Sequence, residues 1–244
     1  MWEWLTMPLF IDRPHEITSM QQLHGRLMFF GWGMLAPLTV IIARFFKVLP
    51  RQDWPGKLDS QFWWRIHWIG QTLVLVCTLV AISLVYNTNL NGQSLHTQLG
   101  YVVLSLVVFQ IALGYFRGSK GGPTAPQADG SLSGDHYDMS LRRRVFEVLH
   151  KSLGYCLLLL AVVTIILGLT QVNAPRWMWI CIITWWSLLV IVFICLQKKG
   201  YAIDTYQAIW GPDPQHPGNT LASNGWGTRR VDGAKHSTAS KPGH

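Results

Sequence analysis

The chain has 244 residues, of which 50% are hydrophobic and 13% are charged, with 13 tryptophans and a formal net charge of +8. Soluble domains carry about 25% charged residues, so this composition disfavours a soluble enzyme and a disordered chain. Four cysteines in a chain of this length do not indicate a small domain built on disulfides.

Long stretches without Asp, Glu, Lys or Arg identify the expected membrane-spanning segments. A helix needs about 20 apolar residues to cross a hydrocarbon core about 30 Å thick. The uncharged stretch between Arg65 and Arg117 is long enough for two helices, and turn-forming residues at 87–94 divide it. We therefore predict an all-α membrane protein, with a four-helix bundle and a fifth transmembrane helix. The expected spans are residues 24–46, 64–86, 95–116, 149–171 and 176–197.

The polar segments divide the chain further. Residues 1–20 form an N-terminal segment that we expect to be extramembrane or interfacial. The core follows at 21–172 and the fifth helix at 173–199. Residues 200–244 form a polar tail, rich in Gly, Pro, Ser and Asn, that we expect to be extended or ordered only by a partner. Residues 118–140 are expected to form a long flexible loop for the same reason.

Basic residues are distributed unevenly between the two sides of this topology. Thirteen Lys and Arg fall on side B, opposite the N-terminus, and three fall on side A, where the chain begins. The positive-inside rule therefore places side B in the cytoplasm and the N-terminus outside. We expect an integral protein of a bacterial inner membrane. Contact with membrane lipid accounts for the net charge, and we expect no binding of nucleic acid.

Four of the nine histidines lie near the starts of the first four spans: His24, His67, His96 and His150. Ionisable side chains at membrane depth are costly, so they are candidates for function. The alternative for each one alone is an interfacial histidine bonded to a headgroup or a carbonyl. Chain direction places His24 and His96 near side A and the other two near side B.

Two histidines on facing helices can supply both axial ligands of a haem iron. Zinc is the competing metal, but it prefers a compact set of four ligands that often includes cysteine. The cysteines lie inside spans and form no CxxC motif, and the absence of CxxCH indicates haem without covalent attachment. The residues therefore favour haem over zinc, with the four histidines as candidate iron ligands.

Neighbouring residues suit a flat macrocycle. Gly100 and Gly154 follow His96 and His150 by four residues, which places each glycine on the same helix face as its histidine. Close helix packing is an equal alternative for each glycine, including Gly31 and Gly70. Further candidate cofactor contacts are Gln71, Arg26, Arg65 and Lys151, although each basic residue could equally be an interfacial anchor.

These segments resemble the four core helices of the cytochrome b561 family, in order. The matching stretches are His24-Gly-Arg-Leu-Met with Trp32 and Pro37, Trp63-Trp-Arg-Ile-His67, His96-Thr-Gln-Leu-Gly100, and His150-Lys-Ser-Leu-Gly154. The resemblance covers about residues 20–172 and is closest to the branch often joined to a DOMON domain. It implies two b haems, one near each membrane face, with His24 paired to His96 and His67 to His150.

The resemblance implies transmembrane electron transfer, and an ascorbate- or ferric-reductase-like oxidoreductase as a possible activity. Arg44 and Lys47 on side B are possible substrate-site residues or simply positive-inside charges. One alternative is a haem-bearing anchor subunit that serves a partner dehydrogenase or a quinone, as part of an oligomer or larger complex. Another is a haem-free scaffold or transporter that uses the histidines as proton-relay groups.

Overall fold

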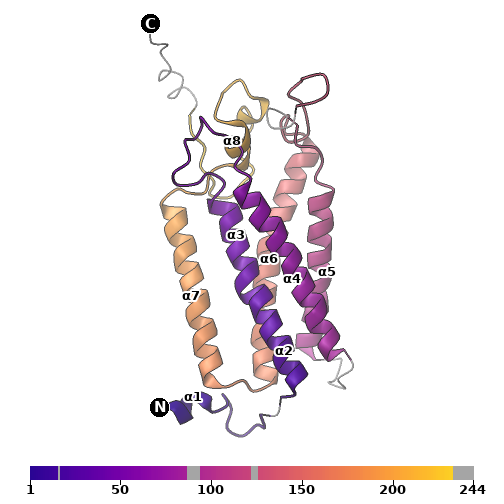
Figure 1. Cartoon of the computed structure of the whole chain (residues 1–244), viewed down its shortest axis with the longest axis vertical. Coiled ribbons are helices and arrows are strands. Elements are labelled where there is room, and N and C mark those ends of the chain that lie inside the picture. Colours follow the sequence, from indigo (N-terminus) through magenta and orange to yellow (C-terminus); the bar gives the residue numbers. More distant parts are fainter. Residues whose placement is uncertain (16, 87–93, 122–125, 233–244) are drawn as a thin grey trace. The chain divides into compact units, whose positions relative to one another are not determined.

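The computed structural model describes residues 1–15, 17–86, 94–121 and 126–232, and the regular secondary structure among them is helical apart from two isolated β-bridges. The turn predicted at 87–94, part of the loop at 118–140 and residues 233–244 therefore lie wholly or partly outside the described residues. The elements, of which α1 to α8 are labelled in Figure 1, are α1 (Trp2–Thr6), α2 (Ser19–Met28), η1 (Phe29–Leu35), α3 (Ala36–Phe45), α4 (Phe62–Val85), α5 (Leu95–Tyr115), α6 (Leu141–Gln171), α7 (Arg176–Lys198), α8 (Thr205–Trp210) and η2 (Pro217–Asn219).

Five helical segments are long and apolar enough to cross a membrane, as the sequence predicts. Ser19–Phe45, which joins α2, η1 and α3, is the first of them, and α4, α5, α6 and α7 are the others. The largest difference is at α6, which begins at Leu141 rather than near residue 149. Its first two turns carry Arg142, Arg143 and Glu147, and the search for uncharged stretches misses them because a helix can extend beyond the apolar layer. The chain is an all-helical integral membrane protein.

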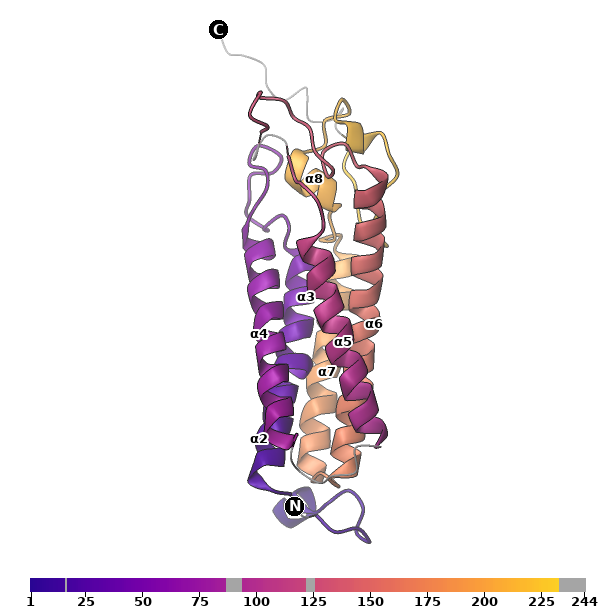
Figure 2. The same cartoon turned by 90° about the vertical axis from the view of Figure 1, so that its right-hand side faces the viewer.

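The described chain divides into two compact units. The first comprises residues 1–40, 67–111 and 153–194, and the second comprises residues 41–66, 112–152 and the chain from 195 onward. In the first unit, the helix formed by α2 and η1 lies beside α4 in both views (Figures 1 and 2), where His24 and Trp32 bond to Ala81 and Thr78.

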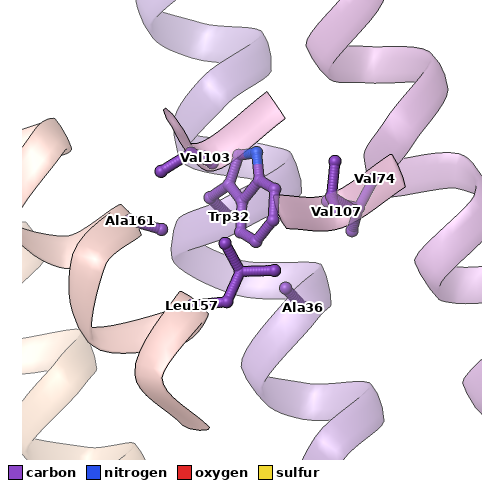
Figure 3. Close-up of a cluster of buried hydrophobic side chains, with 7 residues drawn as sticks. All are labelled: Trp32, Ala36, Val74, Val103, Val107, Leu157 and Ala161. Carbon is purple, nitrogen blue, oxygen red and sulfur yellow. The ribbon is translucent and has the colours of Figure 1, made fainter. Parts of the chain in front are cut away.

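The apolar core of the first unit surrounds Trp32, which is 4% exposed. Its neighbours come from each of the other core helices (Figure 3): Ala36, Val74, Val103, Val107, Leu157 and Ala161. The indole Nε1 donates a hydrogen bond to Thr78 Oγ1 at 2.9 Å, so the polar atom of this large side chain is satisfied inside the core. The helices therefore meet around one aromatic residue.

The first span contains a π-helical segment, η1, that the sequence analysis does not predict. It is seven residues long, and the Ala36 N–H closes its last turn on the Gly31 carbonyl. Pro37 follows directly, and because proline lacks an N–H and crowds the carbonyl four residues before it, regular α-helix is disfavoured here. The structure thus places a π-helical turn directly before Pro37.

The N-terminal segment is tied to the loop between α6 and α7, within the first unit. Asn173 is 2% exposed and holds this segment with its side chain. Its Oδ1 accepts from Phe10 N at 2.9 Å, and its Nδ2 donates to the carbonyls of Phe10 and Arg13 at 2.8 and 2.9 Å. Residues 7–15 are therefore an ordered strap across this loop.

In the second unit, the segment after Gly200 is folded, which corrects the expectation of an extended tail as far as residue 232. Every residue of α8 is buried. Tyr206, Ile209 and Trp210 pack against Met139 from the loop that was expected to be flexible. These three apolar residues have the i, i+3, i+4 spacing of one helix face, but α8 is only six residues long and lies in a stretch rich in Gly and Pro, so composition alone suggests disorder. We call residues 201–232 the C-terminal cap.

Candidate functional site

His24 and His96 are brought together in the first unit. Their ring centroids are 6.0 Å apart and their ring planes are 79° apart. A metal–imidazole bond is about 2 Å long, and a ring centroid lies about 1 Å beyond its nitrogen. Two imidazoles on opposite sides of one iron therefore have centroids about 6 Å apart, so the observed spacing suits a bis-histidine haem.

Each of the two rings is oriented by a backbone carbonyl of a different helix. His24 Nδ1 lies 2.8 Å from Ala81 O on α4, and His96 Nδ1 lies 2.9 Å from Thr164 O on α6. A carbonyl can only accept, so Nδ1 carries the proton in both rings. In each neutral ring, Nε2 is then left with its lone pair, which is the atom that binds a metal.

Gly168 provides the space for the His96 ring. A Cβ built at this glycine would lie 2.8 Å from His96 Cε1 and 3.0 Å from Nδ1. The sequence alone does not reveal this role of Gly168, because it depends on a residue more than seventy positions away. The carbonyls of Ala81 and Thr164 have no sequence signal at all.

The glycines predicted to lie beside a haem differ in what surrounds them: some leave open space and others allow close helix packing. A Cβ at Gly100 would meet no heavy atom within 4 Å, which is compatible with a flat ligand beside His96. At Gly70 it would lie 2.3 Å from Thr39 Cγ2, and at Gly31 it would lie 3.5 Å from Cys77 Cβ. These two glycines therefore allow close helix packing. Gly154 lies at ordinary contact distance from Gln110.

His67 and Gln71 are both attached to Thr39 in the first unit. The His67 ring hydrogen-bonds to the Thr39 backbone, and Gln71 Nε2 donates to Thr39 Oγ1 at 2.6 Å. His67 and Gln71 thus share one neighbour on α3.

His150 lies in the second unit, one helical turn after Glu147 on α6. The Glu147 carboxylate is almost fully buried and lies near three nitrogen donors: Lys151 Nζ at 2.8 Å, Arg143 Nε at 3.2 Å and His136 Nε2 at 3.4 Å. Lys151, a candidate for a haem propionate, is therefore held by its own helix. Arg26 and Arg65 are exposed.

His136 is a buried histidine of the second unit that the sequence analysis does not single out. It is 1% exposed, and its Nδ1 accepts a hydrogen bond from Trp210 Nε1 at 2.9 Å. Because indole only donates, the ring proton lies on Nε2, which faces Glu147. Burial lowers the pKa of His136, against the opposing effect of Glu147.

Arg44 and Lys47 are bonded to the second unit's own residues. Arg44 donates to Gln197 Oε1 and, at 2.7 Å, to the carbonyl of Trp226. Lys47 is 5% exposed and donates to the carbonyls of Arg44 and Ile203 at 3.2 and 3.3 Å. Burial lowers the pKa of Lys47 to about 7, with a further contribution from Lys151. Both cations thus hold the C-terminal cap.

A zinc site receives no support from this arrangement. Across the described ranges, no group of three or more His, Cys, Asp or Glu side chains could hold a metal ion. The cysteines of the described chain are free, and Cys77 is buried against helix neighbours. The donor set that remains is a pair of imidazoles, which fits haem iron better than zinc.

Comparison with known proteins agrees with this donor set. Residues 23–118, which include His24, His67 and His96, match the family model described as eukaryotic cytochrome b561. The chain is a relative of the cytochrome b561 family. Haem b is the cofactor that this family generally binds, and the imidazole pair described above fits it.

The similarity to individual relatives covers more of this chain than the family model does. The chain is 28% identical to human ferric-chelate reductase 1 over 173 residues, which are 69% of this chain and 26% of that protein. It is 29% identical to a Xenopus laevis putative ferric-chelate reductase 1, covering 60% of this chain and 26% of that one. A cytochrome b561, DM13 and DOMON domain-containing protein of Arabidopsis thaliana is 23% identical, covering 71% and 18%.

This chain spans only about a quarter of the length of the ferric-chelate reductases that it matches. The similarity therefore concerns only part of each relative. No solved structure matches the chain.

Proposed function

We propose that this chain transfers electrons across a membrane through two haem b groups, one held by His24 and His96 and the other by His67 and His150. The observation that carries the proposal is the pair of His24 and His96. Their centroids are 6.0 Å apart, and each Nδ1 is engaged by a backbone carbonyl. Haem iron, when bound, supplies the one-electron chemistry, and the chain supplies ligands and orientation.

Helix direction supports the assignment of one redox centre to each face. His24 and His96 lie near the starts of helices that enter from side A, whereas His67 and His150 lie near the starts of helices that enter from side B. Two centres divide a hydrocarbon core of about 30 Å into shorter transfer steps. By the distribution of basic residues we assign side B to the cytoplasm of a bacterial inner membrane.

The electron acceptor is proposed from the relatives. Several are named ferric-chelate reductases, so a ferric chelate is a candidate acceptor for this chain. Arg44 and Lys47, the possible substrate-site residues on side B, already bind carbonyls of the C-terminal cap. We therefore propose that the electron donor is a quinol or a redox protein that does not depend on these two side chains. A reduction assay with each donor in sealed vesicles distinguishes them.

Haem stoichiometry tests the main proposal. Purified full chain should contain two haems by pyridine haemochrome, and His96→Ala should reduce this to one. His67→Ala should remove the other centre, so the two variants should have different reduced-minus-oxidised spectra. A colourless wild-type protein, or loss of the same centre in both variants, would contradict the proposal.

A second candidate function is that of an electron-transfer subunit in a larger complex. It is favoured by the exposed apolar residues of the N-terminal segment, among them Trp2, Trp4 and Ile11, which are 75%, 53% and 70% exposed. Mild-detergent purification should then yield a stable partner, whereas a chain that works alone should elute as a homogeneous species of this polypeptide.

A further inference from the structure

The carbonyl of Gly33 is a backbone acceptor that its own helix cannot fully serve. In an α-helix it would accept from the residue four positions later, which is Pro37, and proline has no N–H to donate. Gly33 is buried inside the first unit. A buried carbonyl at membrane depth requires a donor from elsewhere.

The fifth span supplies two donors. Trp185 Nε1 and Trp186 Nε1, both on α7, donate to Gly33 O at 3.0 and 3.2 Å. A carbonyl oxygen has two lone pairs, so both bonds can form at once. Trp179 on the same helix has a buried Nε1 with no hydrogen-bond partner among the described residues. The pair at 185 and 186 is therefore specific rather than a general property of tryptophans on α7.

This contact lies on the segment that determines the direction of His24. The π-helical turn η1 joins α2, which carries His24, to α3. A π-helical turn contains one residue more than an α-helical turn, and one residue of α-helix corresponds to a rotation of about 100°. If η1 relaxed to α-helix, α2 would rotate relative to α3, and the His24 ring would leave its position opposite His96.

We propose that Trp185 and Trp186 of α7 clamp η1 through the Gly33 carbonyl and thereby position His24 opposite His96. The two tryptophans are positioning residues for this ligand pair, and α7 is part of the site although it contributes no ligand. The inference rests on the proposed function, because it assigns these residues to the binding of one haem.

The test compares Trp185→Phe/Trp186→Phe with Trp179→Phe in the purified full chain. Phenylalanine keeps an aromatic ring but removes the N–H together with part of the indole volume, and Trp179→Phe controls for that loss of volume. The signal of the His24–His96 haem is assigned as the one missing in His96→Ala. Its low-spin ferric EPR spectrum and its midpoint potential are measured, together with the rate at which haem is lost to apomyoglobin.

The double variant should shift the EPR spectrum and the potential of this haem, and lose it about tenfold faster. The His67–His150 haem and the Trp179→Phe protein should remain as in wild type. An unchanged His24–His96 signal in the double variant, with both haems present in wild type, would overturn this inference alone. An equal change in both haems would also overturn it, since that indicates general destabilisation. A wild-type protein without haem would overturn both this inference and the proposed function.

Discussion

Gly168 lies against the His96 imidazole at a distance that leaves no room for a side chain. The ring cannot simply move away, because its Nδ1 is bonded to Thr164 O one turn earlier on the same helix as Gly168. Glycine at position 168, which has a hydrogen atom where alanine has a methyl group, thus permits the orientation of the proposed ligand His96. Such effects of close packing are specific to position and are independent of helix propensity.

Gly168→Ala should therefore displace the His96 ring and reduce the haem content from two to one per chain, with the spectrum of His96→Ala. Gly114→Ala is the control, because a Cβ there would meet no heavy atom within 4 Å. Pyridine haemochrome and difference spectra measure both variants. Two haems retained in Gly168→Ala would show that the ring adjusts at low cost.

Lys47 gives a prediction for pH. Its pKa is lowered from 10.5 to about 7 by burial, so between pH 7 and 10.5 the unfolded chain binds a proton that the folded chain does not. Stability should consequently rise with pH across this window, by up to a few kcal/mol. Lys47→Met should flatten this dependence in thermal unfolding between pH 7 and 9.5. The same slope in both proteins would contradict the assignment to Lys47.

At the scale of elements, the connections between spans hold more structure than their composition indicates. The loop after α6 binds the N-terminal strap through Asn173, whose φ is +49°, a conformation that asparagine tolerates better than most residues. The strap thus links the chain's first residues to the junction of the fourth and fifth spans.

Asn173→Gly keeps this backbone conformation and removes the three side-chain hydrogen bonds to Phe10 and Arg13. The loss should destabilise the strap by about 2–4 kcal/mol. Hydrogen exchange measures it: the Phe10 amide should exchange at least about tenfold faster, whereas amides in the core of α4 should be unchanged. Equal exchange at Phe10 in both proteins would mean that the strap is held by its backbone contacts alone.

At the scale of the whole chain, the C-terminal cap covers Lys47 within the second unit. In wild type, Lys47 should resist acetylation by a pulse of acetic anhydride, whereas the exposed Lys198 should react. Trp210→Ala removes a buried side chain and the bond to His136, so labelling of Lys47 should rise at least about tenfold. Rapid labelling of Lys47 in wild type would contradict a closed cap.

The spans were predictable because charge is excluded from hydrocarbon over the length of a helix, and that signal needs no tertiary information. Helix direction predicted that His24 and His96 lie near the same side, and the family resemblance implied that they form a pair. The π-helical turn was not predictable, because Pro37 indicates only that regular helix is disturbed. Burial of Tyr206, Trp210 and His136 was missed because it depends on contacts between distant segments, and these leave no periodic pattern.

The carbonyls that orient the imidazoles of His24 and His96 determine when, during membrane insertion, this proposed haem site can be completed. His24 on the first span and His96 on the third are oriented by Ala81 on the second and Thr164 on the fourth. The ligand pair is therefore complete only after the chain has been inserted at least as far as residue 164. Haem can be captured there only late in membrane insertion, and a ribosome-stalled chain that ends before α6 should emerge without it.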